Sequence, residues 1–147
     1  MIVTNRQQEL GEWVCKRLDK EYVHGEAQYI GLEIKGKIVA VSMWAGFNGA
    51  SVYSHIAIEG TLNKEFFEFL WFSFYYAFEQ LGVKKIIGLV EASNDKALKL
   101  DKHLGYEIEA TIKDASPTGD LHILTITKSQ CKYLKRRYNV GVETHSY

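Results

Sequence analysis

The sequence predicts a single α/β domain (α+β in its layering) with a mixed, mostly antiparallel β-sheet and one central helix. Its 147 residues, 46% of them hydrophobic, suit one domain with its own core. Three extended segments separated by short turn signals predict consecutive antiparallel strands. A long apolar helix then leads into a short apolar strand, which indicates α/β layering. We expect the domain to span residues 1–138 and residues 139–147 to form a flexible tail.

The amino-terminal segment predicts an amphipathic helix over about residues 5–19. Thr4 and Gln7 have the spacing of a capping box, in which two side chains satisfy the first backbone amides of a helix. Leu10, Val14 and Leu18 recur every four residues and therefore share one face.

The three expected strands begin at Ala27 and carry the segments AQYIGLEI, KIVAVSMWAGF and ASVYSHIAIE. Turn signals at residues 35–36 and 48–49 separate them. Asn63 is the expected N-cap of the central helix, KEFFEFLWFSFYYAFEQL, which Gly82 ends. Hardly any face of this helix is polar, so it belongs against the sheet, and KKIIGLV at residues 84–90 follows as a buried strand.

The rest of the chain predicts a short helix, a hairpin-like pair of strands and a basic end. Asn94 is the N-cap of the helix, whose apolar side chains turn inward, and Gly105 stops it. A strand over residues 106–112, a loop over residues 113–120 with the only proline, and a last strand LHILTIT follow. Residues 128–138 are expected to form a short basic helix.

Charge and cysteine content exclude several classes of function. Lysine plus arginine equals aspartate plus glutamate at 18 each, so no global field draws the chain to DNA or an anionic membrane. No stretch reaches the roughly 18 uncharged apolar residues of a membrane span. Cys15 and Cys131 form neither a CxxC pair nor a zinc-type spacing, which predicts reduced thiols, no metal site and a cytoplasmic location. Asp120 and His122 are too few ligands for a metal.

The spacing N-x-x-A-x-x-L-x-x-x-L-G-Y occurs in the second half of the chain. Its positions are filled by Asn94, Ala97, Leu100, Leu104, Gly105 and Tyr106. This motif resembles the signature of the GNAT acyltransferase superfamily, and the order of the predicted elements over about residues 1–127 resembles that family as well. The resemblance implies a GNAT-like fold in which two parallel strands, here residues 51–59 and 85–90, splay apart. It also implies acetyl-CoA as co-substrate, with its pantetheine arm in the resulting cleft.

The start of the central helix is an anion site on physical grounds, because unpaired N–H groups and the helix dipole converge there. The resemblance implies that this turn holds the pyrophosphate of acetyl-CoA and that backbone amides around Ala57 and Ile58 support the oxyanion. The family's usual turn, Q/R-x-x-G-x-G/A, is replaced here by a turn with one glycine. The expected cofactor-binding residues are Ala57, Ile58, Gly60, Thr61, Leu62, Asn63, Lys64, Ser93, Asn94 and Ala97.

The candidate base that accepts a proton from an attacking amine is His55 or Glu59, ranked equally and above Glu91. His55 and Glu59 share one face of their strand by alternation. The tyrosine that often donates the proton to the departing thiolate in the family is replaced by Asp101. An ionised aspartate cannot donate that proton at neutral pH. The open alternatives are Tyr106, Ser93 or water as the acid, or a thiolate that departs with little help.

Two other functions remain open from the sequence. Several segments resemble small GNAT-like proteins of bacteriophages, among which the Mom family modifies adenine in DNA; Lys132, Lys135, Arg136 and Arg137 would then contact phosphate, in the host cytoplasm. A noncatalytic GNAT-like scaffold is the other alternative. The amine acceptor is not identified. Trp44 and Phe47, near a hairpin tip, are candidate contacts for a homodimer.

Overall fold

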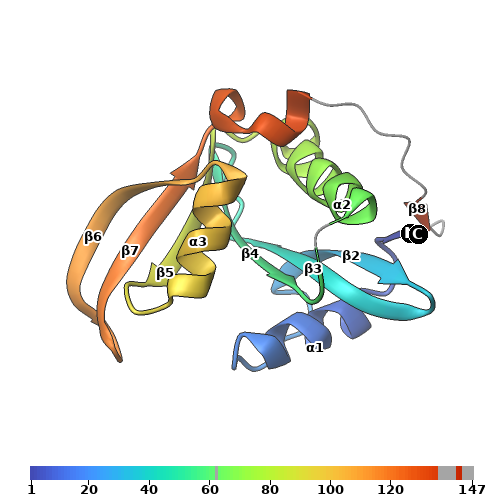
Figure 1. Cartoon of the computed structure of the whole chain (residues 1–147), viewed down its shortest axis with the longest axis horizontal. Coiled ribbons are helices and arrows are strands. Elements are labelled where there is room, and N and C mark those ends of the chain that lie inside the picture. Colours follow the sequence, from blue (N-terminus) through green and yellow to red (C-terminus); the bar gives the residue numbers. More distant parts are fainter. Residues whose placement is uncertain (62, 136–141, 144–147) are drawn as a thin grey trace.

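The computed structural model describes residues 1–61, 63–135 and 142–143 of the chain (Figure 1). Its centre is one mixed sheet in the order β6-β7-β5-β4-β3-β2-β1-β8. The neighbours β4–β5 and β1–β8 run parallel, and the other neighbours run antiparallel. This confirms the predicted mixed, mostly antiparallel sheet. The strands are β1 (Ile2–Val3), β2 (Ala27–Ile34), β3 (Lys37–Ala45), β4 (Ser51–Ile58), β5 (Lys85–Glu91), β6 (Glu107–Ser116), β7 (Gly119–Ile126) and β8 (Val142–Glu143).

Helices cover the sheet from both sides (Figure 1). On one face, α1 packs its apolar stripe on β2 and β3, with Leu10 and Val14 fully buried. On the other face, α2 and α3 share one large core with β5 and β7, in which Phe69 and Phe74 are fully buried. The helices are α1 (Gln7–Arg17), α2 (Lys64–Tyr75) with its π-helical continuation η1 (Tyr76–Leu81), α3 (Asp95–Leu104), and the 3-10 turns η2 (Lys128–Gln130) and η3 (Lys132–Lys135).

The predicted helix ends are confirmed where the signal is local. Asn63 accepts hydrogen bonds from the amides of Glu65 and Phe66, at 3.0 and 3.3 Å. Gly82 adopts a left-handed conformation at the end of η1, with φ of 72°, which L side chains rarely adopt. Short-range chemistry therefore determines where the central helix starts and stops.

The predicted capping box at the start of α1 is wrong. The helix begins at Gln7 with Arg6 and not Thr4 as its N-cap, and the side chain of Arg6 makes no cap hydrogen bond. Gln7 instead donates to the carbonyl oxygens of Thr4 and Tyr29, at 2.7 and 2.8 Å, and accepts from the amide of Tyr29 at 2.9 Å. The glutamine side chain thus ties α1 to β2, because the neighbouring strand offers an unpaired amide and carbonyl at that point.

The predicted loop over residues 113–120 is also wrong. β6 continues to Ser116 and β7 starts at Gly119, so only residues 117–118 turn the chain. Asp120 accepts a hydrogen bond from the amide of Asp114, which has φ of 55° and lies at an irregular part of the β6–β7 pairing. The polar residues that predicted a loop belong instead to the irregular β6–β7 hairpin.

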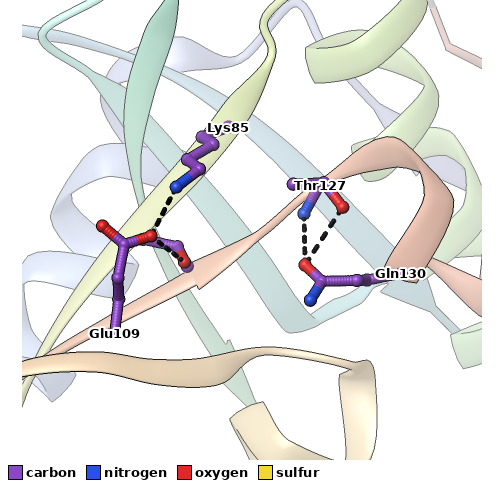
Figure 2. A network of polar contacts seen from close by, with 5 residues as sticks. Lys85, Glu109, Thr127 and Gln130 are labelled. Carbon is purple, nitrogen blue, oxygen red and sulfur yellow. Dashed lines mark hydrogen bonds and ion pairs between the residues drawn. The ribbon is translucent and has the colours of Figure 1, made fainter.

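A three-strand network holds this hairpin against the rest of the sheet. Lys85 of β5 forms an ion pair with Glu109 of β6, and Thr125 of β7 donates to the same carboxylate at 3.0 Å (Figure 2). Nearby, Thr127 and Gln130 form a capping box at η2 (Figure 2). The network therefore joins β5, β6 and β7 through one carboxylate.

Three further predictions concern the basic segment, the expected tail and the residues near the β3–β4 turn. The basic segment forms two 3-10 turns, not one helix, and residues 136–141 lie outside the described residues. Within the expected tail, Val142–Glu143 pairs in parallel with β1. Trp44 is 2% exposed and donates to Ser42, so it is core and not a dimer contact, whereas Phe47 is 50% exposed.

Candidate active site

The two parallel strands β4 and β5 separate after a short ladder, as the resemblance implied. They pair at Ser51–Lys85, Val52–Ile86 and Tyr53–Ile87 and no further. Beyond these pairs β4 remains bonded to β3 as far as Ile58, and β5 remains bonded to β7 as far as Glu91. We call the gap between residues 54–58 and residues 88–91 the opening.

Two adjoining cavities occupy the opening. The larger, of about 600 Å³, reaches from the end of α1 to α3, and the smaller, of about 380 Å³, lies along the end of β4. They share the lining residues Arg17, Ile56, Asn94, Ala97 and Leu100. A cavity of this size is typical of small-molecule sites.

The larger cavity has access to both faces of the sheet. Successive residues of a strand point to opposite faces. Ser54 and Gly88 line the cavity on the side of α2 and α3, whereas His55 and Leu89 line it on the side of α1. Groups that approach from opposite sides of the sheet can therefore meet in the opening.

The beginning of α2 lies at the surface, with Thr61, Asn63 and Lys64 exposed. Gly60 is also exposed and has φ of 95°. The Asn63 side chain already accepts hydrogen bonds from two of the first backbone amides of α2. Fewer of these amides are therefore free to bind an anion than at an uncapped helix start. Leu62 lies outside the described residues.

Of the other expected cofactor residues, most line the cavities. Asn94 and Ala97 border both cavities, and the Asn94 side chain caps α3 by accepting from the amide of Ala97 at 3.1 Å. Ala57 and Ile58 line the smaller cavity. Ser93 does not line either cavity and instead bonds Thr118 of the β6–β7 turn at 2.8 Å.

His55 and Glu59, equal candidates by sequence, differ in their surroundings. His55 is half-buried in the larger cavity, where burial and then the positive charge of Lys20 lower its pKa. Its imidazole is therefore neutral, and able to accept a proton, at neutral pH. Glu91 lines the same cavity and accepts a 3.3 Å hydrogen bond from Thr118.

Glu59 is exposed and engaged by Arg17, a residue that sequence analysis missed. Arg17 donates to the Glu59 carboxylate, and this bond lowers the pKa of Glu59. The same guanidinium lies 3.5 Å from the ring centroid of Trp13 and donates to its carbonyl oxygen at 2.9 Å. A basic residue in the last turn of a helix is a common sequence feature, so only the fold shows that Arg17 borders the site.

Tyr106 and Asp101 lie on the α3 side of the opening. Tyr106 is buried and bonds Ser54 through its hydroxyl at 2.9 Å, and burial raises the pKa of Tyr106 far above its usual range. Burial raises the pKa of Asp101 to about 6. The cavity disfavours the charged form of Asp101, so a minor fraction of its carboxyl groups keeps a proton at neutral pH.

The remaining candidates lie away from the opening. His122 bonds Thr111 at 2.7 Å and not Asp120, and no group of three or more metal-ligating side chains occurs among the described residues. Lys132 and Lys135 are exposed in η3, whereas Arg136 and Arg137 lie outside the described part of the chain. No helix in the described segments is both long and apolar enough to cross a membrane.

No family model and no curated protein sequence matches this chain. Solved structures do match it. A chimera of the spermidine N-acetyltransferase SpeG from Vibrio cholerae and hSSAT superposes with a TM-score of 0.69 at 16% identity, covering 91% of this chain and 98% of the chimera. The Campylobacter jejuni N-acetyltransferase PseH, solved with acetyl coenzyme A, has a TM-score of 0.54 at 20% identity and covers 80% and 77% of the two chains.

These likenesses define the class of fold. The chain has the GNAT fold of the N-acetyltransferases, with the splayed β4–β5 pair and the helix order that the sequence motif predicted. At 16–20% sequence identity the comparison shows the fold alone, so the function has to be argued from the site itself.

Proposed function

We propose that this protein is an acyl-CoA-dependent N-acetyltransferase that transfers the acetyl group of acetyl-CoA directly to an amine. The observation that carries the proposal is the larger cavity, which opens where β4 and β5 stop pairing and has access to both faces of the sheet. Two reactants can enter such a cavity from opposite sides and meet without a covalent enzyme intermediate. The fold supports the proposal, since PseH is described in complex with acetyl coenzyme A.

Acetyl-CoA would lie on the α3 side of the opening. Ile56, Ala97 and Leu100 supply apolar walls for the pantetheine arm, and backbone amides around Ala57 and Ile58 would support the oxyanion. The pyrophosphate would rest at the start of α2. This turn has a single glycine, and Asn63 occupies two of its amides, so positive side chains have to contribute. Lys64, the first residue of α2, and Lys96, which lines the smaller cavity, would supply this charge.

The amine would enter on the α1 side, where His55 accepts its proton. His55 is the better base of the two sequence candidates because it lines the larger cavity, whereas Glu59 does not and is bonded to Arg17. The lowered pKa of His55 keeps its imidazole neutral and able to accept a proton. Glu59 forms an ion pair with Arg17 at the smaller cavity, and its proposed role there is to position the Arg17 side chain. Asp19 and Glu91 line the acceptor side and favour an amine that arrives as a cation.

Calorimetric titration with acetyl-CoA tests the proposal. We expect micromolar binding by the wild type and a loss of at least about 100-fold in affinity for Ala97→Trp, because the indole fills the shared wall of both cavities. Ala110→Trp is the matched control, since Ala110 is exposed on β6 away from the opening. Absence of acetyl-CoA binding by the folded wild type, or equal affinity in Ala97→Trp, would contradict the proposal.

The two alternatives gain no support of their own. The exposed lysines of the basic segment that are described, Lys132 and Lys135, lie in η3 and not at the opening, so DNA modification is not proposed. A noncatalytic scaffold does not need a half-buried histidine and a half-buried carboxyl group in one cavity.

A further inference from the structure

Asp101 stands at the closed end of the opening. Gly88, the first β5 residue after the last β4–β5 pair, faces it: a Cβ atom added to Gly88 would lie 3.7 Å from Oδ2 of Asp101. The same Cβ atom would lie 3.9 Å from Cε1 of Tyr106. All three residues line the larger cavity. The carboxyl group is thus beside the point where β4 and β5 separate.

No cation neutralises this carboxyl group within the described part of the chain. Asp101 takes part in no ion pair or side-chain hydrogen bond there. Arg17, the guanidinium that lines the same cavity, is engaged by Glu59. The titratable or charged groups that face the cavity with Asp101 are Tyr106 before β6, His55 of β4, Glu91 of β5, and Arg17 and Asp19 from the α1 end.

These surroundings favour the protonated form of Asp101 more than water does. Burial raises the pKa of Asp101 to about 6. Roughly one molecule in ten is then protonated at pH 7 in the free protein. A ligand that excludes water from the cavity would raise this fraction.

Asp101 and His55 occupy opposite sides of the sheet. Asp101 belongs to α3, which covers one face, whereas His55 points to the face that α1 covers. Their pKa values are shifted in opposite directions, which leaves one neutral base and one carboxyl group able to keep its proton. Pairs of titratable groups separated in this way mark the acid and the base of a reaction.

We propose that Asp101 is the acid that protonates the sulfur leaving from acetyl-CoA, an inference that rests on the proposed function. An amine that arrives as a cation first gives one proton to water. The neutral amine nitrogen then bonds to the acetyl carbon and the carbon–sulfur bond breaks. The amine proton passes to His55, and the thiolate takes the carboxyl proton of Asp101. The products are the N-acetyl amine and the free thiol of CoA; His55 then releases its proton to water and Asp101 regains one from water.

Rate measurements on matched variants test this role. Thiol release from acetyl-CoA is followed with spermidine and with butylamine as probe amines, and acetyl-CoA affinity is measured by calorimetry. We expect Asp101→Asn to keep the affinity within about threefold and to lower kcat by about 100-fold, since it cannot donate the proton. Asp95→Asn, an exposed carboxylate on the same helix, should match the wild type.

The pH dependence separates an acid from a merely structural carboxylate. An acid must be protonated, so wild-type kcat should fall as pH rises through the pKa of Asp101 in the complex. Asp101→Glu should keep this alkaline limb, Asp101→Asn should lack it, and Asp101→Tyr should move it several pH units upward. The role of Asp101 would be overturned if Asp101→Asn still binds acetyl-CoA and keeps both the wild-type kcat and the alkaline limb of its pH profile. The proposed function would then still stand.

When neither probe amine reacts, a spectroscopic titration tests whether Asp101 keeps its proton with acetyl-CoA bound. The Asp101 carboxyl carbon is assigned by NMR through its disappearance in Asp101→Asn and is titrated with acetyl-CoA bound. A pKa at or above 6 supports the proposal, and a value below 5 overturns it. Failure of the folded wild type to bind acetyl-CoA would instead overturn the proposed function, on which the inference depends.

Discussion

The two halves of the sheet are built differently, and the site lies where they meet. β2 and β3 lie between α1 on one face and α2 on the other, and most of their side chains are buried. β5, β7 and β6 are covered by helices on one face, while Leu89 and Ile112 on the opposite face are 40% and 47% exposed. The sheet hydrogen bonds between the halves are those of the three β4–β5 pairs.

The difference in packing between the two halves explains why the opening lies between β4 and β5. The first half is packed on both of its faces. The second half needs the aromatic core of α2, which contacts it through Phe74: this ring lies 6.4 Å from Tyr106 and 6.3 Å from Tyr133, between centroids. The two halves are therefore held together by the core beneath the opening, so the strands above it are free to separate.

The largest effect is expected from removing that shared core. Phe74→Ala deletes a fully buried ring that joins α2 to the second half, and we expect a loss of about 3–5 kcal/mol in the free energy of unfolding. Ile112→Ala on the exposed face of β6 should change it by less than about 1 kcal/mol. Urea unfolding of both variants measures the difference. Equal losses would show that the halves do not differ in packing as described.

A smaller effect is expected from the hydrogen bond that crosses the opening. Ser54 of β4 and Tyr106, just before β6, are both buried and bond each other at 2.9 Å. Ser54→Ala leaves the tyrosine hydroxyl without this partner and should cost about 1–3 kcal/mol. Tyr106→Phe in the same background should recover part of that loss. A double-mutant cycle by urea unfolding checks this, and strictly additive losses would mean that the two hydroxyls are not coupled.

The order of the elements and most helix ends could be predicted because their signals are short-range. Asn63 and Asn94 cap helices with amides two or three residues away, and Gly82 and Gly105 adopt positive φ. The splayed pair could be predicted from the resemblance, through the motif that begins at Asn94. Local chemistry and the family motif agree here, which is why the fold prediction succeeded.

Apart from the loop predicted over residues 113–120, the errors share a cause, which is contact between distant segments. Gln7 bonds β2 in place of its own helix, and Trp44 donates to Ser42, whose hydroxyl meets Ser73 of α2. The engagement of Glu59 by Arg17 spans 42 residues, and the protonation of Asp101 depends on burial by several elements. A sequence pattern carries no information about which far side chain desolvates or pairs a group.

The smallest effect is expected at the Arg17–Glu59 pair, which joins α1 to the end of β4 at the smaller cavity. Both side chains are partly exposed, so solvent screens the pair, and Glu59→Gln should lower the melting temperature less than Ser54→Ala does. The bond lowers the pKa of Glu59, so its contribution is present above the usual glutamate pKa and is lost as pH falls through the lowered value. Thermal melts of wild type and Glu59→Gln should therefore differ at pH 7, converge at low pH, and converge again at high salt. Glu107→Gln, an exposed carboxylate on β6, is the control; a difference for Glu59→Gln that persists at low pH would show that the side chain acts through packing and not through its charge.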